Sequence, residues 1–233
     1  MGKGGAGKSI IAGTVCRHLA RKQLNVLALD VDTMPGLAYS LGTDSREPTL
    51  PTGLAEMVEG KGWRVVTGAR PSRLVDRYSA RGPDGVRLLA LGKLPHRVEP
   101  TVTVAFRYVM ERFRRPGWSL VADLAAGTRQ PMFRWARFAS VVLIVVEPNA
   151  KSILSARRLR AVATHVIANK VSSRADVDLI SSAVDLPLAG VLPYDEFLAE
   201  AERRGIAPID LAPDAPLVKA GGELASRLAE GQL

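Results

Sequence analysis

Apolar residues follow two alternating patterns along this chain of 233 residues. Some form short uninterrupted runs, such as residues 141–146, and such runs are typical of strands that are buried on both faces of a parallel sheet. Others recur every three or four residues, as Ile11, Val15 and Leu19 do, which predicts the buried face of a helix. Because the two patterns alternate, we expect an α/β fold, with a mostly parallel, doubly wound sheet and helices on both faces.

The same patterns locate the individual elements. We expect strands at residues 25–29, 86–91, 119–124, 141–146, 165–168 and 188–192. We expect helices from Ser9 onward and at residues 101–114, 152–162, 177–184, 195–204 and 216–230. Residues 43–84 are rich in Pro, Gly and charge, and we expect loops there with one short helix near residues 54–58. The elements fit a single domain over residues 1–233.

Composition limits where the protein works. Hydrophobic residues make up 47% of the chain, enough to bury a core, but no apolar run reaches the roughly 18 residues that span a membrane. Nothing resembles a cationic, apolar leader. The single cysteine, Cys16, excludes an internal disulfide and a metal site built from a cysteine pair of one chain. We therefore expect a cytoplasmic protein without a membrane partner.

The net charge of +9 is concentrated in the middle of the chain, where residues 97–160 hold twelve basic and four acidic side chains. A basic face can bind nucleic acid or an acidic partner. The chain also has 24 Arg against 8 Lys and is rich in Ala, which is the composition of a GC-rich genome and explains the charge without any partner. Composition alone does not choose between these interpretations.

A glycine-rich loop carries the chemistry, because residues 2–9 fit the pattern G-x-x-x-x-G-K-[ST] completely. In such a loop the backbone N–H groups turn inward around phosphate oxygens, and the following helix adds its positive end. Lys8 is expected to reach the β- and γ-phosphates, and the Ser9 hydroxyl to bind Mg²⁺. A chance glycine-rich turn is disfavoured by eight matching positions followed by an amphipathic helix. The predicted ATP-binding residues here are Gly4, Gly5, Ala6, Gly7, Lys8, Ser9 and Ile10.

A second lysine, Lys3, lies inside this loop, in the order K-G-G-x-G-K-S. The stretch resembles the deviant Walker A motif of the MinD/ParA group of P-loop ATPases. The resemblance implies an ATP-dependent homodimer in which Lys3 reaches the phosphates bound to the partner subunit, much as an arginine finger does.

Later motifs occur in the order that this resemblance implies. Asp30 and Asp32 end the second expected element and resemble the first switch, with Asp32 orienting the attacking water near Mg²⁺ and Asp30 in support. Thr33 follows where the family usually has Pro. Asp123 ends an apolar strand, as in the Walker B motif, and would hold Mg²⁺ through water. Gly127 would sense the γ-phosphate through its backbone N–H.

Two further segments are expected to contact the nucleotide. Asn169 and Lys170 follow an apolar strand and resemble the adenine-reading pair of the family, since an amide can both donate to and accept from the adenine edge. Pro193 and Tyr194 lie in a run that is also similar to the family. Val171 and Ser172 follow Asn169-Lys170 in place of the x-Asp of guanine readers, so ATP is expected rather than GTP.

Within the family, the chain resembles the ATPases that help insert nickel into carbon monoxide dehydrogenase. The similar stretches are residues 88–93, 123–127, 145–152 and 190–195. The resemblance implies an ATPase switch whose client protein is a nickel enzyme. The Cys-x-Cys of the nickel-handling members is missing, because residues 95–100 read Pro-His-Arg-Val-Glu-Pro. His96 and Glu99 are conceivable ligands there, but we assign no transition metal.

Other functions remain in competition with metallocentre maturation. A ParA-like ATPase that positions DNA would use the basic middle region as a phosphate-binding face. A MinD-like cycle on membranes is disfavoured, because the last expected helix lacks a polar face rich in Lys and Arg. A nucleotide-binding remnant without turnover is the remaining alternative, since the switch sequence departs from the family.

The strand that leads into the loop in this family has no counterpart here, because only Met1 precedes Gly2. A parallel sheet without this central strand would leave buried backbone groups unpaired, at roughly 1–3 kcal/mol each. We therefore expect an upstream apolar segment, rich in β-branched residues, in the native gene product.

Overall fold

The computed structural model describes residues 1–32, 36–43, 49–92, 100–127 and 135–233. Its strands are β1 (Asn25–Asp30), β2 (Ala55–Val58), β3 (Gly62–Val65), β4 (Ala80–Arg81), β5 (Arg87–Ala90), β6 (Trp118–Asp123), β7 (Leu143–Val146), β8 (His165–Val171) and β9 (Leu188–Pro193). Its α-helices are α1 (Lys8–Arg21), α2 (Leu37–Leu41), α3 (Pro71–Tyr78), α4 (Pro100–Arg112), α6 (Ala150–Leu159), α7 (Arg174–Val184), α8 (Phe197–Arg204), α9 (Pro208–Leu211) and α10 (Pro216–Ala229). Two short 3₁₀ helices are η1 (Pro83–Gly85) and η2 (Arg160–Val162).

The strands form two main sheets. The first has the order β4-β5-β1-β6, and all its pairs are parallel except β4 with β5. Its register places Asp30 at the end of β1 opposite Asp123 at the end of β6, so two carboxylates meet at the same edge. The second sheet has the order β7-β8-β9 and is parallel throughout.

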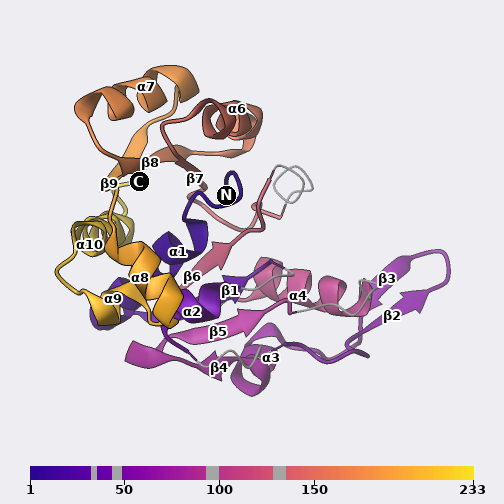
Figure 1. Cartoon of the computed structure of the whole chain (residues 1–233). Helices are drawn as coiled ribbons and strands as arrows, with labels where there is room; N and C mark the ends of the chain where they lie inside the picture. Colours follow the sequence, from indigo (N-terminus) through magenta and orange to yellow (C-terminus); the bar gives the residue numbers. More distant parts are fainter. Residues whose placement is uncertain (33–35, 44–48, 93–99, 128–134) are drawn as a thin grey trace.

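Alternate residues of the strands face two different cores, as expected for strands covered on both sides. In β1, Leu27 and Leu29 pack into one core, whereas Val26 and Ala28 pack into the other. The first core also contains side chains of α3, α4, α6 and α7, and the second contains those of α1, α2 and α10. Figure 1 shows α6 and α7 across the β7–β9 sheet from α1 and α10. The predicted α/β fold with a mostly parallel sheet is confirmed.

Several local expectations were wrong. Residues 43–84, where loops were expected, also contain α3 and β4. Residues 54–58 do not form a helix: β2 and β3 pair as an antiparallel hairpin, with Met57 opposite Trp63. Five residues are too few to distinguish a helical period from a strand period. Here the pairing with β3 stabilises the segment as a strand. The strand expected at residues 141–146 begins only at Leu143, and Val141 and Val142 are half-buried beside it.

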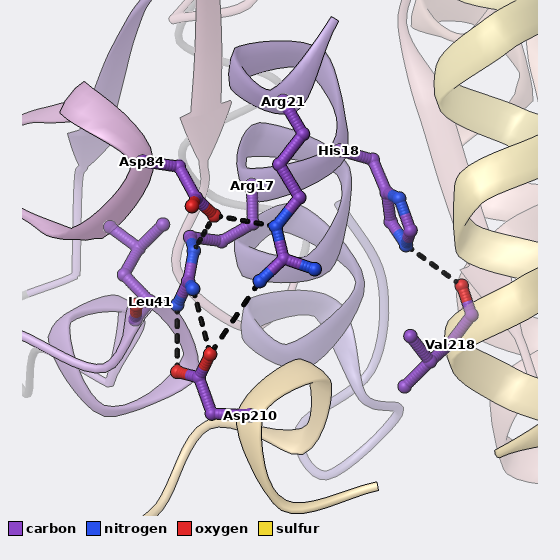
Figure 2. A network of polar contacts seen from close by, with 7 residues as sticks. All are labelled: Arg17, His18, Arg21, Leu41, Asp84, Asp210 and Val218. Carbon is purple, nitrogen blue, oxygen red and sulfur yellow. Dashed lines mark hydrogen bonds and ion pairs between the residues drawn. The ribbon is translucent and has the colours of Figure 1, made fainter. Parts of the chain in front are cut away.

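A buried arginine of α1, Arg17, forms hydrogen bonds with residues of α2, η1 and α9 (Figure 2). Arg17 is 2% exposed, and its guanidinium donates to Asp210 at 2.7 and 2.8 Å and to Asp84 at 2.5 Å. It also donates to the Leu41 carbonyl at 2.7 Å. One side chain therefore joins α1 to α2, η1 and α9. Within the described part of the chain, no helix is long and apolar enough to cross a membrane.

Candidate nucleotide-binding site

The loop of residues 2–7 leads directly into α1, and Gly7 caps that helix in a left-handed conformation, with φ of 86°. A Cβ atom at this position would lie 2.6 Å from Asn169 Nδ2, so a side chain here would both strain the backbone and collide with the strand behind it. The loop consequently lies close against β8. The first N–H groups of a helix have no acceptor within the helix, so the start of α1 beside this loop is suited to bind an anion.

Lys8, the first residue of α1, folds back over the loop. Its Nζ donates to the Lys3 carbonyl at 3.1 Å. Burial lowers the pKa of Lys8, and the nearby carboxylates of Asp123 and Asp32 partly offset this effect. A partly desolvated ammonium whose acceptor among the described residues is a neutral carbonyl is suited to a phosphate group, which would replace that carbonyl.

Ser9 and Asp123 form the pair that fits a magnesium ion. The Ser9 hydroxyl donates to Asp123 Oδ2 at 2.5 Å, from the first turn of α1 to the end of β6. Burial raises the pKa of Asp123, and the Ser9 hydrogen bond and the Met1 ammonium oppose the rise. Hydroxyl and carboxylate oxygens are the hard ligands that Mg²⁺ accepts.

The Asp30 carboxylate accepts hydrogen bonds from the backbone on both sides of the switch segment, including that of Asp32. Its Oδ1 accepts from the Asp32 N–H at 3.1 Å, and its Oδ2 accepts from the Leu37 N–H at 3.0 Å. Burial raises the pKa of Asp30 to about 7. The two hydrogen bonds fix the start of the switch segment and the start of α2. Thr33 and Pro35 lie outside the described residues.

Glu147 follows β7 and pairs with two lysines of the site. Lys3 Nζ lies 3.1 Å from its Oε2, and Lys170 Nζ lies 2.7 Å from its Oε1. Asn149 Nδ2 also donates to Oε2 at 3.1 Å. The side chain of Glu147 is 8% exposed. Glu147 was not among the predicted site residues, although it directly follows a fully apolar strand and lies in the similar stretch of residues 145–152.

Asn169 and Lys170 of β8 form hydrogen bonds with backbone carbonyls of the glycine-rich loop. Asn169 is 1% exposed, lies within β8 rather than after it, and donates through Nδ2 to the Ala6 carbonyl at 2.8 Å. Its Oδ1 is buried and has no hydrogen-bond partner among the described residues. Lys170, at a φ of 57°, donates to the Gly5 carbonyl at 2.9 Å.

The remaining predicted residues divide into two groups. The Gly127 N–H donates to the Gly2 carbonyl at 3.0 Å, so the segment after β6 contacts the loop itself. Pro193 ends β9, and Tyr194 is 59% exposed, with its N–H donating to the Val171 carbonyl rather than to the loop. The structure thus brings Gly127 to the loop and leaves Tyr194 at the surface.

Transition-metal ligands do not gather in the described ranges, where no group of three His, Cys, Asp or Glu side chains could hold an ion. Cys16 is fully buried in α1, and burial raises the pKa of its thiol. His96 and Glu99 lie outside the described residues.

A glycine-rich loop at a helix N-terminus, with a lysine over it and a serine–aspartate pair beside it, defines a P-loop nucleotide-binding protein. The chain matches the CobQ/CobB/MinD/ParA nucleotide binding domain over residues 1–209 and belongs to that family. The resemblance to the MinD/ParA group is confirmed.

Individual relatives span nearly the whole chain. The carbon monoxide dehydrogenase accessory protein CooC of Rhodospirillum rubrum is 26% identical over 237 residues, which cover 91% of this chain and 89% of that protein. An ATP-binding protein of Methanocaldococcus jannaschii is 26% identical over 238 residues, with coverage of 90% and 89%. The structure of the septum site-determining protein MinD of Pyrococcus horikoshii, complexed with Mg-ADP, has a TM-score of 0.76 at 20% identity, with coverage of 97% and 92%.

Proposed function

We propose that this chain is a homodimeric molecular switch that binds and hydrolyses ATP with Mg²⁺. The observation that carries the proposal is the loop before α1, where Lys8 donates to the Lys3 carbonyl and Ser9 donates to Asp123. Residues 1–233 act as one domain in this proposal, and the protein works in the cytoplasm.

Each of the described side chains has a separate role in ATP hydrolysis. Ser9 and Asp123 would hold Mg²⁺, which supplies charge neutralisation at the phosphates when it is bound. Lys8 binds the β- and γ-phosphates, and the Gly127 N–H would sense the γ-phosphate by exchanging its hydrogen bond to the Gly2 carbonyl for one to a phosphate oxygen. Asp32, held by Asp30, orients the attacking water.

Lys3 completes the site of the partner subunit. Its side chain is 35% exposed while it pairs with Glu147, so a second subunit can reach it. We infer that closure of the ATP-bound dimer transfers Lys3 from Glu147 to the phosphates of the partner. Hydrolysis then removes the γ-phosphate and reopens the dimer.

The client of the switch is proposed to be an enzyme with a metal centre, such as a carbon monoxide dehydrogenase-like nickel enzyme. The support is the similarity to the accessory protein CooC over 91% of this chain. The chain has a single cysteine, so a thiolate site shared between subunits is not part of the proposal.

Two alanine variants test the ATPase. Lys8→Ala removes the phosphate-directed charge within the subunit and should weaken ATP binding to the monomer at least tenfold. Lys3→Ala should leave that binding intact but abolish ATP-dependent dimerisation, and reduce turnover by roughly 10³–10⁵-fold, or about 4–7 kcal/mol of barrier. Nucleotide titration, light scattering with ATP and phosphate release measure the three quantities.

Lys22→Ala, at the far end of α1, is the matched control and should change none of them. Normal dimerisation and turnover of Lys3→Ala would contradict the role of Lys3. ATP binding without turnover by the unmodified chain would instead identify a nucleotide-binding remnant.

A second candidate is a ParA-like ATPase that positions DNA. It would use the basic region of residues 97–160, where Lys151, Arg157, Arg158 and Arg160 are exposed on and beside α6. Such a face would bind phosphates without reading sequence, and its affinity would fall steeply with salt. Retention on immobilised DNA at two salt concentrations separates this candidate from metallocentre maturation.

A further inference from the structure

Three arginines, Arg81, Arg87 and Arg115, gather at one edge of the first sheet, and we call them the arginine cluster. Among the described residues β4 is the edge strand of this sheet, and its exposed Arg81 lies directly opposite Arg87 of β5. Like charges that face each other across two strands weaken their pairing. A charge on an edge strand can prevent aggregation, but that role does not need a second arginine opposite. The fold therefore does not account for this pair.

Arg87 is held at the end of α3 by uncharged acceptors. Its Nε donates to Ser79 Oγ at 2.8 Å, and its Nη2 donates to two carbonyls in the last turn of α3 at 2.9 and 3.1 Å. Burial and the neighbouring charges of Arg81 and Arg115 lower the pKa of Arg87, and the Asp76 carboxylate opposes this effect. An anion bound beside Arg87 would compensate for the like charges.

Arg115, which precedes β6, is fixed in place beside α3. Its guanidinium donates to both oxygens of the Asp76 carboxylate at 2.7 and 3.0 Å. It also lies 5.1 Å from the centre of the Trp118 ring. Guanidinium groups that are already ordered lose less side-chain entropy when they bind a carboxylate than mobile ones do. The cluster is therefore preorganised, with three cations around one carboxylate.

The surroundings of the cluster favour separate carboxylates over a chain of phosphates. The Asp76 side chain is 54% exposed among the arginines and would repel a nucleic acid, which carries a charge at every nucleotide. The Trp118 ring already contacts Arg115 and Phe113, and these contacts compete with the stacking of a base. A peptide can place single carboxylates beside arginines and an uncharged residue beside Asp76. The fork of a guanidinium also matches a carboxylate, as the pair of Arg115 and Asp76 shows.

We propose that the arginine cluster docks a short acidic segment of a partner protein, whose carboxylates bind Arg81 and Arg87. In the order β4-β5-β1-β6, the cluster's edge strand and the strand that carries Asp123 of the nucleotide site lie at opposite ends. Docking therefore needs no nucleotide, and the proposal does not rest on ATP hydrolysis.

Binding of a defined probe, measured without nucleotide, tests the proposal. The probe is a short fluorescent peptide of alternating Glu and Ala, and fluorescence anisotropy measures its affinity for the full chain. We expect saturable binding at low salt that weakens as the ionic strength rises. The matched peptide with Gln in place of Glu should not bind. Absence of saturable binding of the Glu peptide at low salt would overturn the proposal.

Two double variants locate the probe on the surface. Arg81→Gln/Arg115→Gln should weaken binding by roughly three- to tenfold, because it removes two partly exposed charges of the cluster. Arg158→Gln/Arg160→Gln, on and beside α6, is the matched control and should leave the affinity unchanged. It removes the same charge and likewise takes one arginine, Arg160, from an exposed ion pair. Equal weakening by both variants would overturn the proposal, since it indicates attraction to the net charge alone.

Two single variants keep the test decisive if the double variant does not fold. Arg81→Gln removes only an exposed charge opposite Arg87, so it should weaken binding about twofold without lowering the melting temperature. Asp76→Asn removes the carboxylate that competes for Arg115 and should strengthen binding roughly two- to fivefold. Unchanged or weaker binding by Asp76→Asn would overturn the proposal.

Two other occupants are distinguished in the same experiment. A DNA duplex that displaces the peptide, and whose own binding is lost in Arg81→Gln/Arg115→Gln, would identify a nucleic-acid site and overturn the proposal. Light scattering without nucleotide tests for a second copy of the chain. Association that rises with concentration and is abolished by the same variant would also overturn the proposal.

Discussion

At the residue scale, Glu147 combines burial with three hydrogen-bond donors. Burial raises the pKa of this carboxyl, but hydrogen bonds from Lys170, Asn149 and Lys3 outweigh burial and hold the pKa below its usual value. A carboxylate whose pKa is lower in the folded than in the unfolded state stabilises the fold at neutral pH. That stability is lost as the pH falls through the folded pKa.

Glu147→Gln should therefore lower the free energy of unfolding by about 1 kcal/mol at neutral pH, because both lysines are a third exposed and water screens the pairs. The difference from the unmodified chain should shrink below about pH 4, where the carboxylate itself takes up a proton. Urea unfolding at both pH values measures it. Glu111→Gln, which breaks an exposed pair with Arg107, is the control and should have a smaller effect. A difference that does not change with pH would contradict this account.

At the scale of elements, the hydrogen bonds and ion pairs of Arg17 hold α2, η1 and α9 against α1. Arg17→Ala would leave two carboxylates, Asp84 and Asp210, and the Leu41 carbonyl without their shared donor. Removing one partner of a buried ion pair typically costs about 3–5 kcal/mol, and the partial exposure of both aspartates reduces this to about 2–4 kcal/mol here.

Arg21→Ala is the matched control, because Arg21 contacts the same two aspartates from a side chain that is 41% exposed. It should cost less than about 1 kcal/mol. Urea unfolding at constant m-value compares the two variants. Equal losses would show that burial of Arg17 does not matter to the network.

Elements with a strong apolar period could be predicted from sequence, and elements fixed by distant partners could not. The apolar run of β1 and the 3.6-residue period of α1 are local signals. The β2–β3 hairpin depends on cross-strand pairs such as Met57 with Trp63, and α2 on the hydrogen bond from Leu37 to Asp30. The same holds at the site: the loop is a contiguous motif, but Glu147 meets Lys3 across 144 residues of sequence.

At the scale of the whole molecule, the phosphate loop connects the two sheets. Ser9 binds Asp123 of the first sheet, whereas Asn169 of the second sheet binds the Ala6 carbonyl and Glu147 binds Lys3. A nucleotide held by this loop would contact groups anchored in both sheets. Its binding energy would therefore add to the stability of the entire fold rather than of one sheet.

Nucleotide choice should consequently be visible in the thermal stability of the unmodified chain. At about 100 times the dissociation constant, Mg-ATP should add about 2.7 kcal/mol, which raises the melting temperature by roughly 5–11 °C. Mg-GTP at the same concentration should give a smaller shift. Asn169 Oδ1 is buried and has no hydrogen-bond partner among the described residues. Once nucleotide binding uncovers it, this oxygen would accept from the amino group of adenine, whereas guanine presents a carbonyl oxygen at that position. Lys8→Ala, which removes the phosphate contact, should lose most of the shift with both nucleotides, and equal shifts with ATP and GTP in the unmodified chain would contradict adenine reading by Asn169.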